Sequence, residues 1–270
     1  MDDTAVSNLL IIGGNEDKQG ECLILRKFVT MAGGARSHIV VVTTATELPQ
    51  EVGEEYRLLF TELGAGSVSV LYMEDREATN DHNNVAEIDK ATGIFFTGGD
   101  QLRLTSLLGG STVDKSIRAV IAQGTVVAGT SAGASVMSDT MIVGGHSSDT
   151  PKKSSLSMAH GMSLLRDVVI DQHFAQRGRI NRLLAAVAQN PHVLGIGIDE
   201  DTALSVEPGG KCVVIGSRTV TIVDGKNIAH SNISESSRDE PLAITNVILH
   251  ILPAGFGFDI NRRLPYNCRT

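Results

Sequence analysis

Short runs of apolar residues alternate with amphipathic segments through the first half of the chain. The apolar runs predict strands at residues 9–12, 38–43, 67–72, 93–97 and 125–128. The segments between them predict helices at residues 16–31, 49–63, 101–108 and 113–122. The strand runs are mostly continuous rather than alternating with polar residues, as expected where helices cover both faces of a sheet. The pattern therefore predicts a doubly wound, mainly parallel α/β sheet.

The second half of the chain has more closely spaced apolar runs. A strand is expected at residues 167–170 and a helix at 180–188, followed by strands at 194–198, 203–206, 212–215 and 220–223. The short turns between these strands are typical of antiparallel hairpins that extend the sheet. Two Ser-rich segments, 144–157 and 231–239, predict exposed loops, and the first is also a candidate lid. Without a repeat or a clear linker, residues 1–270 are expected to form one domain.

Composition and charge narrow the class of protein. With 270 residues, 41% hydrophobic and 20% charged, the chain is globular rather than disordered. A net charge of −8 argues against a nucleic-acid partner. The widely spaced Cys22, Cys212 and Cys268 form no C-x-x-C pair, which predicts reduced thiols in the cytoplasm and no metal site. The apolar run at residues 9–12 is too short for a signal peptide or a membrane span, so no membrane association is expected.

Glycines follow three of the predicted parallel strands, at Gly13-Gly14, Gly98-Gly99 and Gly129. Ligands of open parallel sheets bind beyond the carboxyl ends of the strands, so these turns are expected to border one crevice. Neither the dinucleotide motif G-x-G-x-x-G nor the P-loop motif is complete at these turns. No phosphate-bearing cofactor is therefore expected.

The segment Gly129-Thr130-Ser131-Ala132-Gly133 matches G-x-S-x-G between a predicted strand and a helix. This is the context of a nucleophile elbow, in which a tight turn exposes the serine. The N-terminus of the following helix would offer N–H groups and partial positive charge to an oxyanion. The alternative interpretation is close packing of small residues, but the context favours Ser131 as a nucleophile.

A serine nucleophile needs a base, and eight histidines are available. His173 stands out because it lies at the carboxyl end of a predicted strand, within Asp171-Gln172-His173-Phe174. The orienting acid is expected at another strand end, where Asp199, Glu200 and Asp201 are candidates. Side chains alternate faces near a strand end, so Glu200 points away from both aspartates. The chain order Ser, His, acid differs from the order in α/β-hydrolases, which indicates another lineage with the same geometry.

Together these segments resemble the cyanophycinase group of the peptidase E-like (S51) serine peptidases. The resemblance covers almost the whole chain. It rests on Gly13-Gly14 with Glu16-Asp17-Lys18, on FTGGDQLRL at 96–104, on AGTSAGA at 128–134, on DQHF at 171–174 with the arginines that follow, and on GIGIDEDT at 195–202. It implies a flavodoxin-like three-layer sandwich, related to class I glutamine amidotransferases with serine in place of cysteine. It also implies a homodimer and no cofactor.

The resemblance assigns roles to residues of this chain. Ser131 is then the nucleophile, His173 the base and Glu200 the acid that orients it. The backbone N–H of Ala132, with that of Gly99 or Asp100, would form the oxyanion hole. The positions that match the family's substrate pocket are Gln101, Asp171, Gln172, Arg177, Arg179 and Arg182.

The implied substrate is cyanophycin, a poly-aspartate whose β-carboxyl groups each carry an arginine, cut to β-Asp-Arg dipeptides. Guanidinium groups pair well with the carboxylates of such a polymer, so the three arginines after His173 suit this substrate. Asp171 could meet the substrate guanidinium or brace those arginines, and a solvated basic surface is the alternative. Two other functions stay open: a peptidase E-like dipeptidase acting on short aspartyl peptides, and a non-catalytic flavodoxin-like binding module.

Overall fold

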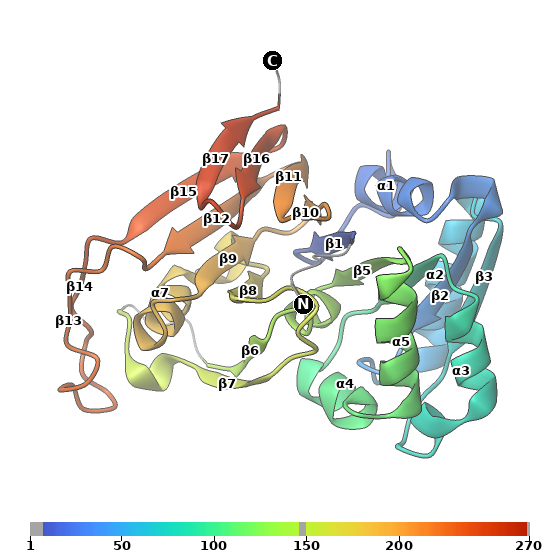
Figure 1. The fold of residues 1–270 in the computed structure, drawn as a ribbon, viewed down its shortest axis with the longest axis horizontal. Coiled ribbons are helices and arrows are strands. Elements are labelled where there is room, and N and C mark those ends of the chain that lie inside the picture. Colours follow the sequence, from blue (N-terminus) through green and yellow to red (C-terminus); the bar gives the residue numbers. More distant parts are fainter. Residues whose placement is uncertain (1–7, 146–149, 269–270) are drawn as a thin grey trace.

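The computed structural model describes residues 8–145 and 150–268, and within these residues the main sheet has nine strands (Figure 1). Its parallel part contains, in spatial order, β1 (Leu9–Ile12), β5 (Val126–Thr130), β4 (Gly93–Phe96), β2 (His38–Val42) and β3 (Ser67–Leu71). Its antiparallel part continues outward from β1 with β10 (Thr202–Val206), β11 (Lys211–Gly216), β16 (Phe256–Asp259) and β17 (Leu264–Asn267). The predicted parallel sheet with an antiparallel extension is confirmed.

Helices cover both faces of the parallel part, because successive side chains of each strand point to opposite faces. On one face, Leu10 and Ile12 of β1 pack in a cluster with side chains of α1 (Leu23–Met31) and α2 (Pro49–Glu62). On the other face, Leu9 and Ile11 belong to a cluster that includes residues of α3 (His82–Asp89), α4 (Gln101–Leu108) and α5 (Thr112–Ala122). The continuous apolar strands of the sequence are therefore buried on both sides.

A second sheet, of four strands among the described residues, lies toward the other end of the molecule from α3 and α5 (Figure 1). Its order is β15 (Ile248–Pro253), β12 (Thr219–Asp224), β9 (Leu194–Ile198) and β8 (Val168–Gln172), and α7 (Ile180–Gln189) packs against it. The strands at 194–198 and 220–223 were expected to extend the main sheet, and that placement is wrong. The crossover through α7 brings β9 beside β8 in parallel, and β12 then pairs with β9.

Several local features differ from the sequence pattern. The helix expected at residues 16–31 begins only at Leu23, because the Asp17 carboxylate accepts backbone N–H groups of Gln19, Gly20 and Cys22 and holds a turn there. Helix α3 was not expected. Neither were the hairpins β6 (Thr140–Gly144) with β7 (Ser157–His160), β13 (His230–Ser231) with β14 (Ile244–Thr245), and β16 with β17. Short 3₁₀ turns lie at Gly34–Arg36, Ala78–Asn80, Lys153–Ser155 and Ala175–Arg177.

The two Ser-rich segments have different outcomes. Residues 146–149 of the candidate lid lie outside the described residues. The part that follows forms a 3₁₀ turn and β7. From residue 232 to 239 the chain is irregular and mostly exposed, as predicted. In the described part of the chain, no helix combines the length and the apolar character that crossing a membrane requires.

Candidate active site

Ser131 lies at the sharp turn between β5 and the short helix α6 (Ala132–Ser135). Its φ of 52° and ψ of −109° are unusual for a residue other than glycine. The turn is tight enough that a Cβ on Gly133 would lie 2.3 Å from the carbonyl oxygen of Phe96. The elbow expected from G-x-S-x-G is therefore present in the backbone, with its serine at the carboxyl edge of the parallel strands.

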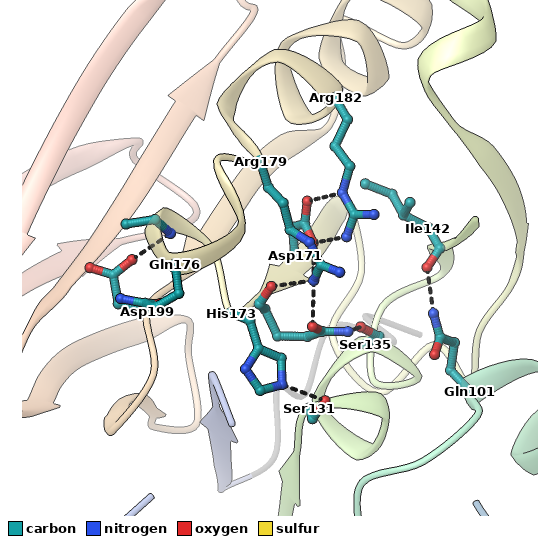
Figure 2. A network of polar contacts seen from close by, with 12 residues as sticks. Gln101, Ser131, Ser135, Ile142, Asp171, His173, Gln176, Arg179, Arg182 and Asp199 are labelled. Atoms are coloured by element: carbon teal, nitrogen blue, oxygen red, sulfur yellow. Dashed lines mark hydrogen bonds and ion pairs between the residues drawn. The ribbon is translucent and has the colours of Figure 1, made fainter. Parts of the chain in front are cut away.

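Ser131, His173 and Glu200 form a continuous series of hydrogen bonds. Ser131 Oγ lies 2.9 Å from His173 Nε2, and His173 Nδ1 lies 2.8 Å from Glu200 Oε1. Figure 2 shows the His173 ring directed at Ser131. The three residues follow β5, β8 and β9, so three strand ends supply the series. The backbone N–H of His173 also donates to Gly13 O at 2.8 Å, which fixes the ring relative to β1.

The protonation of this series follows from burial and hydrogen bonding. Burial lowers the pKa of His173, while the hydrogen bond to Glu200 works in the opposite direction. The same hydrogen bond lowers the pKa of Glu200. At neutral pH the imidazole is therefore neutral and the carboxylate is ionised. In that state Nδ1–H donates to Glu200, and Nε2 accepts the hydroxyl hydrogen of Ser131.

The two aspartates beside Glu200 have other roles. Asp199 accepts hydrogen bonds from Ala175 N at 3.0 Å and from Thr219 Oγ1 at 2.8 Å. Asp201 Oδ1 accepts from Asp17 N at 3.0 Å. Of the three candidate acids, it is Glu200 that reaches His173.

Two residues that the sequence did not single out hold Glu200. Asn15 Nδ2 donates to Glu200 Oε2 at 3.1 Å, and Gln176 Oε1 accepts from the backbone N–H of Glu200 at 2.9 Å. Asn15 follows the first glycine pair, and its φ is 47°. A polar residue directly after a glycine turn was the available signal, but its contact with residue 200 could not be read from the sequence.

The backbone N–H groups at the elbow narrow the possible oxyanion donors. Ala132 is the first residue of α6, so its N–H has no carbonyl within the helix to bond. The N–H of Asp100 donates to Ala45 O at 2.8 Å, while its side chain caps α4. The N–H of Gly99 is therefore the remaining candidate for a second donor. Its φ is 140°, and a Cβ there would lie 2.0 Å from Ala45 O, so the turn requires glycine.

Four of the residues expected to line a substrate pocket, Asp171, Gln172, Arg179 and Arg182, are joined in a largely buried network (Figure 2). Asp171 is 1% exposed, and Arg182 is 5% exposed. Arg182 donates through Nε to Asp171 Oδ2 at 2.6 Å and through Nη2 to Oδ1. Arg179 Nη1 lies 3.4 Å from Asp171 Oδ1. Of the two roles considered for Asp171, the structure shows the bracing of arginines.

The other members of this set connect elements around the elbow. Gln172 is buried, accepts from Arg179 Nη1 at 2.6 Å, and donates to Ser135 Oγ of α6 at 3.2 Å. Gln101 Nε2 donates to the carbonyl of Ile142 at 2.8 Å. Burial lowers the pKa of Arg179 to about 10. Arg177 is exposed, and its charge contributes to the lowered pKa of His173.

A cleft of about 680 Å³ is lined in part by Ser131. Its walls include Asn15, Glu16, Lys18, Glu55 and Tyr56. None of the residues expected from the sequence to bind substrate lines it. The signals for this cleft in the sequence were the segment Glu16-Asp17-Lys18 and the turn Gly98-Gly99, which was expected to border a crevice. In the described part of the chain, no group of three or more His, Cys, Asp or Glu side chains is arranged to hold a metal.

Known proteins share the sequence pattern and the fold of this chain. The model of peptidase family S51 matches residues 9–215. A cyanophycinase of Nostoc sp. (strain PCC 7120) is 42% identical over 256 residues, covering 94% of this chain and 86% of that protein. A cyanophycinase of Geminocystis herdmanii is 42% identical over 258 residues, covering 95% and 94%. A peptidase of an acI-B1 Actinobacterium, 20% identical in sequence, shares the fold with a TM-score of 0.69 over 95% of this chain and 98% of that chain.

Proposed function

Because this chain belongs to peptidase family S51 and is a serine peptidase, we propose that it degrades cyanophycin to β-Asp-Arg dipeptides from a chain end. The observation that carries the proposal is the hydrogen-bonded series from Ser131 through His173 to Glu200. The substrate is inferred from the cyanophycinases that are 42% identical over most of the chain. Neither the acylation nor the deacylation described below calls for a cofactor.

In the proposed acylation step, Ser131 Oγ attacks a backbone carbonyl carbon of the substrate. His173 Nε2 takes the hydroxyl proton as the O–C bond forms, and the ionised Glu200 stabilises the resulting imidazolium. The N–H groups of Ala132 and Gly99 donate to the oxyanion. The tetrahedral intermediate then collapses, the C–N bond breaks, and His173 gives its proton to the leaving amine.

Water completes the cycle. His173 takes a proton from the attacking water, and the acyl bond to Ser131 breaks as the proton returns to Oγ. The buried network of Asp171, Arg179 and Arg182 has a supporting role in this proposal. It fixes the backbone on either side of Gln172, one residue before His173, and so holds the imidazole at hydrogen-bond distance from Ser131.

We further propose that residues 1–270 act as one catalytic domain in a cytoplasmic homodimer. The main sheet takes strands from both halves of the chain, which favours one domain. The cysteines described are all free, which suits a reducing compartment. The edge strand β15 exposes Leu249 and Ile251, and such an edge favours association. Light scattering coupled to size exclusion tests the dimer, and an elution as monomer at micromolar concentration contradicts it.

The function is tested with an insoluble cyanophycin suspension, α-aspartyl dipeptides and casein as parallel substrates. The proposal predicts clearing of cyanophycin, release of a product with the mass of β-Asp-Arg, and rates on casein that are orders of magnitude lower. Ser131→Ala is expected to abolish clearing with the fold intact. Preference for α-aspartyl dipeptides would instead identify a peptidase E-like dipeptidase. Absence of hydrolysis from all three substrates would favour a binding module.

A further inference from the structure

The segment Glu16-Asp17-Lys18 between β1 and α1 has no role in the proposed catalytic steps, yet it borders the cleft beside Ser131. Its three side chains are charged but lie in different environments. The two carboxylates are engaged within the protein, whereas the ammonium lies on the cleft wall. This difference suggests that the carboxylates build the segment and the lysine meets a ligand.

Glu16 fixes the segment to the elbow. It is 5% exposed, its Oε1 accepts from Tyr56 Oη at 2.5 Å, and its Oε2 accepts from Thr130 Oγ1 at 2.6 Å. Thr130 directly precedes Ser131, and Tyr56 belongs to α2. Glu16 therefore holds the segment against both the nucleophile turn and the helix on the far wall of the cleft.

Asp17 fixes the turn that follows. Its carboxylate accepts N–H groups of Gln19 at 3.0 Å, Gly20 at 2.7 Å and Cys22 at 3.0 Å, and these hydrogen bonds lower its pKa. Its own N–H donates to Asp201 Oδ1. The backbone before Lys18 is thus held by a hydrogen bond to Asp201, and the backbone after it by the local turn that the Asp17 carboxylate closes.

Lys18 presents its ammonium on this fixed backbone. Its Nζ lies 3.1 Å from Glu55 Oε1 and 4.2 Å from the centroid of the Tyr56 ring. The side chain of Lys18 is 28% exposed and that of Glu55 is 53% exposed. An exposed ion pair of this kind is weak and readily exchanged, while the aromatic ring continues to favour a cation at this place.

Two of the arginines near the site, Arg179 and Arg182, are less available because they are already paired. Arg182 and Arg179 both donate to the buried Asp171, so a substrate carboxylate would have to displace a buried, charge-assisted partner. Among the described residues that line the cleft, Lys18 is the one with a cationic side chain. Within this cleft, the positive charge available to an anion is therefore that of Lys18.

We propose that Lys18 binds a carboxylate of the substrate unit held at Ser131 and so determines specificity. The inference rests on the proposed function, because cyanophycin supplies the carboxylate. Two sources offer this chemistry: the α-carboxylate of each attached arginine and the terminal carboxylate of the polymer. A carboxylate entering the cleft replaces Glu55 as the partner of the ammonium.

The first test replaces Lys18 with methionine, which keeps an unbranched chain over Tyr56 and removes the charge. The KM for cyanophycin is expected to rise roughly 10- to 100-fold, the range for a lost hydrogen bond to a charged group. The turnover rate is expected to stay within about threefold, because the contact is made equally in the ground and transition states. Lys18→Arg should recover most of the affinity. Lys90→Met is the matched control. Lys90 Nζ lies 3.0 Å from Glu87 Oε1 in an exposed ion pair, and neither residue lines the cleft.

Glu55→Gln distinguishes substrate binding from a structural role of the ion pair. It removes the resident partner of Lys18 but leaves the ammonium in place. If Lys18 binds substrate, the KM of this variant stays at the parental value or falls. Equal rises of KM in Lys18→Met and Glu55→Gln would overturn the proposal, as would a Lys18→Met enzyme with parental KM.

Modified oligomers identify the source of the carboxylate. One carries arginine amide in place of each attached arginine, and the other ends in a carboxamide. The penalty of Lys18→Met should disappear on the oligomer that lacks the recognised carboxylate. A penalty retained in full on both would contradict carboxylate recognition.

Direct binding separates this inference from the proposed function. Calorimetry with β-aspartyl-arginine compares Ser131→Ala protein with and without Lys18→Met, and an at least tenfold weaker affinity is expected in the double variant. Equal affinity overturns the inference. A clear difference in affinity, together with a parent enzyme that leaves cyanophycin intact, would refute the proposed function and leave the role of Lys18 standing.

Discussion

Replacing Arg182 with methionine is expected to destabilise the fold rather than to weaken substrate binding. Removing one partner of a buried ion pair leaves an uncompensated charge and costs about 3–5 kcal/mol. Here Asp171 keeps Arg179 Nη1 at 3.4 Å, so the lower end, about 3 kcal/mol, is expected. Arg182→Lys should cost about 1–2 kcal/mol, because an ammonium replaces one of the two guanidinium bonds.

The assay is urea unfolding followed by circular dichroism, since the chain has no tryptophan. A loss of about 3 kcal/mol corresponds to a fall in Tm of roughly 6–12 °C for a chain of this size. Arg57→Met is the control, because Arg57 pairs with Glu54 at the surface and should lose less than about 1 kcal/mol. Below its melting range, Arg182→Met should keep a KM for cyanophycin within about threefold of the parent. Parental stability with a KM raised tenfold or more would show that Arg182 contacts the substrate and that this reasoning is wrong.

Three further predictions concern the catalytic centre. Glu200→Gln should lower the turnover rate roughly a thousandfold or more with KM little changed, because the acid sets the tautomer of His173. The assay is steady-state kinetics, and a turnover rate that falls less than tenfold would contradict this role. Burial lowers the pKa of His173 from 6.5, and only the neutral imidazole accepts the serine proton. The acid limb of the pH profile of kcat/KM should therefore have its midpoint below pH 6.5. A midpoint above pH 7 would count against His173 as the base. Gly99→Ala should abolish activity, because its Cβ would meet Ala45 O at 2.0 Å. Gly110→Ala, also at positive φ but facing open space, should stay near parental activity, and equal losses in both would exclude a specific role for Gly99.

Much of the parallel sheet could be predicted from the sequence, because its strands are continuous apolar runs between amphipathic helices. The nucleophile elbow could also be predicted from the sequence, since the G-x-S-x-G motif places a serine between a strand and a helix. Alternation near the end of β9 left a choice between Glu200 and the two aspartates, and the resemblance to the S51 family decided for Glu200. These features depend on local patterns of a few residues, and such patterns are what a single sequence contains.

The features that were missed depend on contacts between distant residues. The division of the later strands between two sheets is decided by the crossover through α7, and spacing alone suggested one sheet. A cluster of arginines looks the same in sequence whether it faces substrate or a buried carboxylate, so the pairing of Asp171 with these arginines could be named as one of two roles but not chosen. The contact of Asn15 with Glu200 joins residues 185 positions apart, and no local pattern indicates it.

The most direct test of the central claim is peptide mapping by mass spectrometry after treatment with a fluorophosphonate. The account predicts a single adduct, on Ser131, that forms more slowly when cyanophycin is present and is missing from the Ser131→Ala protein. An adduct on another residue, or labelling of Ser131 at the same rate with and without cyanophycin, would contradict the claim that Ser131 is the nucleophile that opens this polymer.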